Sequence, residues 1–213
     1  MIFPTVNMIW LASSSESSKG KRVLNPESIV PGDLLIGLPS SGLHSNGYSL
    51  ARKVLLEFGG LKLRQQVPEL GRSLGEELLE PTRIYAKMTG DLFAKHAIKG
   101  AAHITGGGIP GNLPRILTRR AARLDQPGKL ACSAGVRFDP KVGRVSRDEM
   151  DRTFNNGLGM ILVVGKQQVD GVISTLKKMR ERYFMIGEIK KAGEGYPGFL
   201  RDKPCDDKFS SAY

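Results

Sequence analysis

Two short segments rich in glycine and small polar residues are the best suited to bind an anion. The first, Ser40-Ser41-Gly42-Leu43-His44-Ser45-Asn46-Gly47, lies between an apolar run and a stretch with helical spacing. Backbone N–H groups at the start of a helix have no partner within it, and the helix dipole adds positive potential there. Serine hydroxyls and the Asn46 amide add donors, and His44 could donate to a phosphate or exchange a proton. This segment is a candidate phosphate loop.

The same residues also have a simpler interpretation. Ser and Asn in front of a helix often only cap its first turn, and on its own Asn46 fits that role better than a ligand-binding one. The eight residues together favour a site over a cap, because the glycines also allow the backbone to approach a ligand closely.

The second segment, Thr105-Gly106-Gly107-Gly108, follows another apolar run. Three consecutive glycines cost backbone entropy on folding, which favours close approach to a ligand, with a tight turn as the alternative. Asn112 and Arg115 follow where a short helix would present them. His103, within the preceding strand, and His96, on the packed face of a helix, are interpreted as core residues rather than catalysts.

A third polar segment, Arg152 to Gly157, precedes a strand and could be a simple turn. Arg152 could pair with a phosphate or with Asp148, four residues earlier. The sequence contains no G-x-x-x-x-G-K-[ST] phosphate loop and no paired-cysteine metal site. No acidic pair has a spacing that proposes a metal site, so residues that would hold a metal ion are not evident.

Short strands and helices alternate between these segments. Apolar runs predict strands, and recurring apolar residues at helical spacing predict helices, including one in which Ile84, Met88 and Leu92 share a packed face. The pattern predicts an α/β (α+β) sandwich with one sheet covered by helices. The expected strands are 33–38, 101–104, 159–164 and 184–191, the helices 48–58, 83–97 and 166–182, with a loop and short helix over 61–82 and a helix start capped by Ser146.

Composition excludes some classes of protein. The chain has 213 residues, 40% hydrophobic and 25% charged, and no run near the ~20 apolar residues of a spanning helix. We therefore expect a soluble protein without a membrane partner. Cys132 and Cys205 have no zinc-site spacing, and two lone thiols fit a reducing compartment, so we expect the cytoplasm.

The net charge of +11 raises the question of nucleic-acid binding. The basic residues are scattered, with one denser segment from Arg115 to Arg123, and no aromatic residues alternate with them to stack on bases. A solvated surface explains most of them, and we expect no nucleic-acid partner. A basic balance also suits an enzyme of small phosphorylated substrates.

Four ordered motifs resemble one known family. They are GDLLIGLPSSGLHSNGYSLARKVL, EPTRIY, AHITGGGIPGNLPRIL and EMDRTFNNGLGMILVV. Together they resemble the C-terminal domain of the aminoimidazole ribonucleotide synthetase family, the phosphoribosylformylglycinamidine cyclo-ligases, over Val30 to Ile189. The version in the middle of the multifunctional animal purine enzyme is the most similar.

The resemblance implies a mixed sheet covered by helices and an ATP-dependent ligase of purine biosynthesis. In that reaction ATP activates the formyl oxygen of formylglycinamidine ribonucleotide as a phosphate ester, a ring nitrogen attacks, and phosphate leaves. It also implies ATP and Mg²⁺ as cofactors, held mainly by an N-terminal domain. His44 would be the catalytic candidate. The residues matched to substrate or phosphate binding are Ser40, Ser41, Gly42, Ser45, Asn46, Gly47, Thr105, Gly106, Gly107, Gly108 and Asn112.

The chain departs from the family pattern in three places. The N-terminal half is replaced by a leader over 1–25, the segment 118–145 within the domain 26–191 diverges, and Asn156 stands where Cys or Met is common. Residues 192–213 are expected to form a tail. The resulting hypothesis is a truncated cyclo-ligase, inactive alone, whose partners are the substrate and the missing N-terminal domain or a full-length subunit. The alternative is a non-catalytic truncated isoform or phosphate-binding interaction module.

Overall fold

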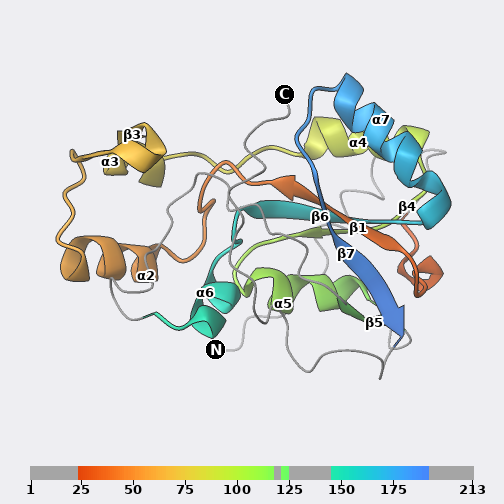
Figure 1. The fold of residues 1–213 in the computed structure, drawn as a ribbon, viewed down its shortest axis with the longest axis horizontal. Coiled ribbons are helices and arrows are strands. Elements are labelled where there is room, and N and C mark those ends of the chain that lie inside the picture. The colour runs from red at the N-terminus through yellow and green to blue at the C-terminus, as the bar shows by residue number, and fades with distance from the viewer. Residues whose placement is uncertain (1–23, 118–120, 125–144, 192–213) are drawn as a thin grey trace, which may run out of the picture.

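One sheet forms the centre of the molecule in a computed structural model that describes residues 24–117, 121–124 and 145–191. Its order is β4-β6-β1-β7-β5, and helices lie on both sides of it (Figure 1). The strands are β1 (Leu34–Pro39), β4 (Ile98–His103), β5 (Ala121–Leu124), β6 (Leu158–Val164) and β7 (Phe184–Lys191).

The sheet is built from two interleaved β-α-β units. β1 is antiparallel to both β6 and β7, and β4 is antiparallel to β6, so β1 runs parallel to β4 and β6 runs parallel to β7. Helix α4 (Ala86–Lys95) lies in the connection from β1 to β4, and α7 (Val169–Lys178) in that from β6 to β7. This is a split β-α-β arrangement. The ends of β1 and β4 and the start of β6 therefore meet at one edge of the sheet.

The predicted α/β sandwich is confirmed, but the direction of its strands differs from the expected mixed sheet. Every neighbouring pair among the described strands is antiparallel. The reason is the interleaving, which inserts an oppositely directed strand between the two parallel strands of each unit.

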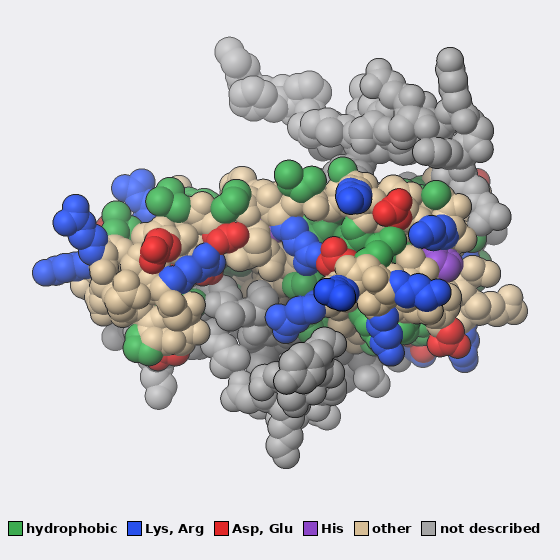
Figure 2. All heavy atoms as spheres, turned by 90° about the horizontal axis from the view of Figure 1, so that it is seen from above, with side chains coloured by type: hydrophobic (Ala, Val, Ile, Leu, Met, Phe, Trp, Pro, Cys, Tyr) green, Lys and Arg blue, Asp and Glu red, His purple; other side chains and the backbone are tan. Residues whose placement is uncertain are grey.

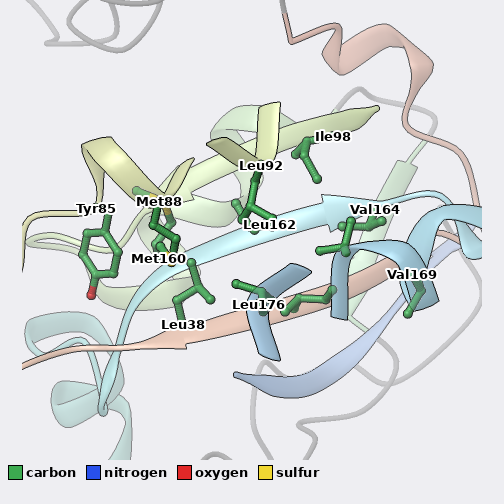
Figure 3. Packing of buried hydrophobic residues seen from close by; sticks show 12 residues of the cluster. Leu38, Tyr85, Met88, Leu92, Ile98, Met160, Leu162, Val164, Val169 and Leu176 are labelled. Atoms are coloured by element: carbon green, nitrogen blue, oxygen red, sulfur yellow. The ribbon is translucent and has the colours of Figure 1, made fainter. Parts of the chain in front are cut away.

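Alternating side chains of β6 pack on the two faces of the sheet. Met160, Leu162 and Val164 face α4 and α7, where Leu92 and Leu176 are fully buried against them (Figure 3). Ile161 and Val163 face the opposite layer, formed by α5 (Gly108–Asn112) and the 3₁₀ turn η4 (Leu113–Ile116). Burial on both faces explains why β6 is an uninterrupted apolar run.

A smaller lobe lies beside the sheet and has its own apolar cluster, to which Phe154 contributes. Its α2 (Tyr48–Arg52) continues into a π-helical turn, η2 (Lys53–Phe58). A Ser73–Glu76 capping box starts its α3 (Leu74–Leu78). The remaining elements are β2 (Gln66–Val67), β3 (Arg72–Ser73), α6 (Arg147–Thr153) and the 3₁₀ turns η1 (Pro26–Ser28), η3 (Pro68–Leu70) and η5 (Lys166–Gln168).

The predicted elements are found with shifted ends. The strands expected at 184–191 and 159–164 are confirmed to within one residue. The strand expected at 101–104 begins earlier, at Ile98. The Ser146 side chain accepts from the Glu149 N–H, as expected for a helix cap. The helix expected over 83–97 is only α4, and the prediction for Ile84 was wrong: its side chain is 85% exposed. Ile84 precedes the helix, so helical spacing does not apply to it.

Part of the predicted organisation lies outside the described residues. This holds for almost all of the leader 1–25, for most of 118–145 with Cys132, and for the tail 192–213 with Cys205. Within 118–145, the segment that diverges from the family pattern, residues 121–124 form β5 against β7. Among the described helices, none combines the length and the apolar character needed to cross a bilayer.

Candidate functional site

The three polar segments identified in the sequence meet at one edge of the sheet. We call them the first loop (Ser40–Gly47), the second loop (Thr105–Gly108) and the third loop (Arg152–Gly157). A Cβ placed on Gly106 would lie 3.3 Å from Asn46 Oδ1, so the first two loops are in contact. A Cβ on Gly108 would lie 1.9 Å from the Asp151 carbonyl oxygen, and one on Gly47 2.4 Å from the Phe154 ring. Glycine is required at both positions because Asp151, just before the third loop, and Phe154, within it, pass so closely.

Hydroxyl groups of the first loop fix it to its surroundings. Ser41 Oγ donates to the Pro81 carbonyl at 2.7 Å, and Ser45 Oγ lies 3.0 Å from Thr82 Oγ1. Ser40 is buried, and its Oγ lies 3.4 Å from Asn155 Oδ1. The EPTRIY segment thus forms one wall of the loop. Backbone N–H groups at the start of α2 are the donors best suited to a ligand.

Asn46 does not cap α2, contrary to the simpler interpretation of the sequence. The N-cap is Gly47, in the left-handed conformation at φ 76°, and no side chain bonds to the helix start. The reason is that the glycine supplies a backbone conformation unfavourable to other residues. Asn46 makes no side-chain hydrogen bond to another described residue, and its amide lies beside Gly106.

Asn112 holds the second loop together from within. Its Nδ2 donates to the carbonyl oxygens of Thr105, Gly106 and Gly108, and its Oδ1 accepts from Thr105 Oγ1. The residue is 5% exposed. The structure therefore brings Asn112 to the predicted site, but its amide is used by the loop itself. Arg115, further along, is exposed on η4.

His44 is folded back into its own loop. Its backbone is left-handed at φ 57°, its side chain is 3% exposed, and its Nε2 accepts from the Ser41 N–H at 3.1 Å. Burial, with smaller contributions from nearby His103 and Arg83, lowers the pKa of His44 to about 4. The ring is thus neutral at pH 7, and because Nε2 accepts, its proton lies on Nδ1. Nδ1 is buried without a hydrogen-bond partner among the described residues.

Tyr85 and His103 adjoin His44. Tyr85 Oη donates to the Pro39 carbonyl at 2.7 Å, and burial raises the pKa of its hydroxyl. Burial also lowers the pKa of His103, which lies at the end of β4 as expected. The third histidine, His96, follows α4, and its Nε2 lies 2.7 Å from Thr175 Oγ1. His96 is half-buried and lies after the end of α4, not on the packed face of a helix as predicted, and its bond to Thr175 gives it a structural role.

The third loop contributes a residue that the sequence did not single out. Asn155, 4% exposed, donates from Nδ2 to the Gly42 carbonyl at 2.9 Å and accepts at Oδ1 from the Gly157 N–H at 2.9 Å. It ties the first loop to the third. Asn156 is left-handed at φ 50° and donates to Asp151 Oδ1 at 2.7 Å, a role an asparagine can fill where the family commonly has Cys or Met.

Several cations near these loops already pair with carboxylates. Arg72 contacts Glu77 and Glu80 beneath Gly42, and Arg83 pairs with Glu181. Lys and Arg side chains are scattered with acidic ones between them on the face shown in Figure 2. In the described part of the chain, no group of three His, Cys, Asp or Glu side chains is arranged to hold a metal ion. The site therefore offers mainly neutral donors.

Comparison with known proteins shows which family has this sequence pattern. Residues 30–198 match the family model described as AIR synthase related protein, C-terminal domain. The phosphoribosylformylglycinamidine cyclo-ligase of Carboxydothermus hydrogenoformans is 49% identical over 174 residues, and that of Myxococcus xanthus 50% identical over 177. Each alignment covers 81% of this chain and 50% of the relative. The chain thus spans about half the length of the curated relatives it matches.

A solved structure supports the fold. The thiamine-monophosphate kinase of Stenotrophomonas maltophilia superposes with a TM-score of 0.51 at 19% identity, over 81% of this chain and 51% of that one. At this identity the likeness concerns architecture alone. The family match covers the sheet and all three loops, and so the chain belongs to the family of AIR synthase related proteins, whose C-terminal domain it contains over residues 30–198.

Proposed function

We propose that this chain is the phosphate-binding half of a phosphoribosylformylglycinamidine cyclo-ligase of purine biosynthesis. The first and second loops would bind phosphate groups of formylglycinamidine ribonucleotide or of the nucleotide. ATP and Mg²⁺ would be held mainly by a further domain corresponding to the other half of the relatives' length. Because the chain spans about half of those relatives, we expect it to be inactive without that domain.

The observation that carries this proposal is the contact of the two glycine-rich loops at one sheet edge, with Gly106 beside Asn46. Neutral donors that are fixed before the ligand arrives suit a phosphate group, since little ordering is needed on binding. A neutral His44, with its proton on Nδ1 and its Nε2 accepting from the Ser41 N–H, would serve to hold the first loop and as a hydrogen-bond donor rather than as a fixed cation.

Two assays test the proposal separately. The first is isothermal titration of the purified chain with formylglycinamidine ribonucleotide, with Asn46→Ala as the variant. We expect heat from the unaltered chain and weaker binding by Asn46→Ala. No heat at millimolar ligand would contradict phosphate binding.

The second assay measures ATP-dependent imidazole formation, with and without the separately produced N-terminal half of a cyclo-ligase relative. We expect turnover only when both parts are present. Turnover by the chain alone would disprove the requirement for a second domain. Binding without turnover in the presence of both parts would instead favour a non-catalytic module.

A further inference from the structure

Three aromatic rings from distant parts of the sequence form one cluster under the first loop. Ring centroids lie 6.2 Å apart for His44 and Tyr85, 6.2 Å for His44 and His103, and 6.0 Å for Tyr85 and His103. The rings come from the first loop, the residue before α4 and the last residue of β4. The proposed function gives His44 a role but none to the other two rings.

His44 needs support to keep its position. A non-glycine residue at positive φ is uncommon and costs free energy, so the surrounding structure has to hold it. The bond from the Ser41 N–H to Nε2 exists only while the ring keeps one orientation and one tautomer. Rotation of the ring would break the bond that closes the loop.

Tyr85 is itself fixed. Its hydroxyl bonds to Pro39, the last residue of β1, and the Arg83 guanidinium lies 5.2 Å from its ring centroid. Gly159 leaves the space for these rings, since a Cβ there would lie 1.9 Å from Tyr85 Oη and 2.6 Å from His44 Cε1. His103 is the third ring of the cluster and the last residue of β4, the strand at one edge of the sheet.

We propose that His103 is a positioning residue for the first loop. Its ring, together with that of Tyr85, holds the His44 imidazole in the orientation in which Nε2 accepts from the Ser41 N–H and the proton stays on Nδ1. This inference deepens the proposed function, because the loop held in this way is the one assigned to phosphate. It also connects the first loop with β4 and hence with the second loop.

Nitrogen-15 NMR of the ligand-free chain tests the proposal directly. The sequence contains only three histidines, so the imidazole signals of each can be assigned by substitution. In the unaltered chain at pH 7 we expect His44 as a single Nδ1–H tautomer. His103→Asn removes the ring and should convert the His44 signals to an average of both tautomers, whereas His103→Phe keeps a ring and should preserve the single tautomer.

His96→Asn is the matched control, because His96 bonds to Thr175 and lies outside the ring cluster. It should leave the His44 signals unchanged. A folded His103→Asn variant that keeps the single Nδ1–H tautomer would overturn the proposal. If that variant does not fold, averaged tautomers in a folded His103→Phe variant would overturn it equally, since the ring contact would then not be what positions His44.

Titration with inorganic phosphate separates this proposal from the proposed function. We expect His103→Asn to lose affinity for phosphate while His96→Asn keeps it. If the unaltered chain does not bind phosphate but its His44 tautomer depends on His103, the proposed function fails and the positioning role stands. If affinity is unchanged in His103→Asn, the positioning role has no bearing on the ligand and the inference fails.

Discussion

At the scale of single residues, the site is held by side chains that were expected to bind a ligand. Ser41, Ser45 and Asn112 all bond to neighbouring protein groups, and the His44 ring closes its own loop. These contacts fix the backbone N–H groups before any ligand is present. An anion would therefore meet a preformed loop.

Gly159 provides a residue-scale prediction. Gly159→Ala would place a methyl group 1.9 Å from Tyr85 Oη, and moving the buried rings apart should cost about 1–3 kcal/mol of unfolding free energy. Urea denaturation measures the change. Gly90→Ala in α4 is the control, because nothing lies within 4 Å of its added methyl and alanine should stabilise the helix by about 0.5–1 kcal/mol. Equal effects of both substitutions would contradict the packing described here.

The pH dependence of stability gives a second prediction. Because the pKa of His44 is lowered to about 4 from 6.5, the unfolded chain binds a proton between these pH values that the folded chain does not. Unfolding free energy should therefore fall as pH decreases through this window, by roughly 2 kcal/mol between pH 7 and pH 5 from His44 alone. Asparagine tolerates the left-handed backbone, so the His44→Asn variant should fold and lose this part of the pH dependence. Parallel profiles of unfolding free energy against pH for the two proteins would contradict the contribution assigned to His44.

Asn155 gives a third prediction, on the stability of the folded chain. Asn155→Ala would leave the Gly42 carbonyl and the Gly157 N–H without their partner in a buried place, at a cost of about 1–3 kcal/mol. Thermal and urea unfolding check the value. Asn46→Ala is the comparison: Asn46 bonds to no other described side chain or backbone group, so stability should change little even though ligand binding falls. A destabilised Asn46→Ala variant would show that its amide has a structural role.

At the scale of elements, an ion pair between the buried carboxylate of Asp33 and the partly exposed Lys99 joins the start of β1 to β4. Lys99 Nζ lies 2.7 and 2.8 Å from the two carboxylate oxygens of Asp33, which also accepts from the Val30 N–H. Lys99→Ala would leave the Asp33 charge buried and unpaired, so we expect a loss of roughly 3 kcal/mol in urea unfolding. Lys190→Ala, which affects the more exposed pair with Glu188, should cost at most about 1 kcal/mol. A small effect of Lys99→Ala would mean that water reaches Asp33.

The sequence predicted elements well where one local signal determines them. β6 and β7 are apolar runs, and Ser146 caps a helix through its own side chain. Prediction failed at Ile84, where apolar spacing continued past the true helix start. In 61–82 the expected short helix is present as α3, but the hairpin of β2 and β3 was not predicted, because strands of two residues have too little periodicity to detect. The roles of Asn155 and Tyr85 depend on partners more than forty residues away, which no local pattern contains.

At the scale of the whole molecule, the charge and the strand order are the informative features. The sequence has a net charge of +11, and on the face shown in Figure 2 the basic side chains of the described residues are scattered with acidic ones between them. We expect retention of duplex DNA no stronger than that of a size-matched basic protein of equal net charge, measured by salt-dependent elution. Retention at much higher salt than the control would indicate a nucleic-acid partner instead.

The interleaved strand order has a consequence for how the site comes into being during synthesis. β1 ends at Pro39, but its neighbours in the sheet begin only at Leu158 and Phe184. The first loop thus leaves the ribosome before β6 and β7, and its supporting strand β1 stays unpaired until those two strands have been made. Non-local pairing of this kind slows folding and exposes unpaired strand edges meanwhile. The segment that would bind phosphate is therefore made before the strands that complete its support.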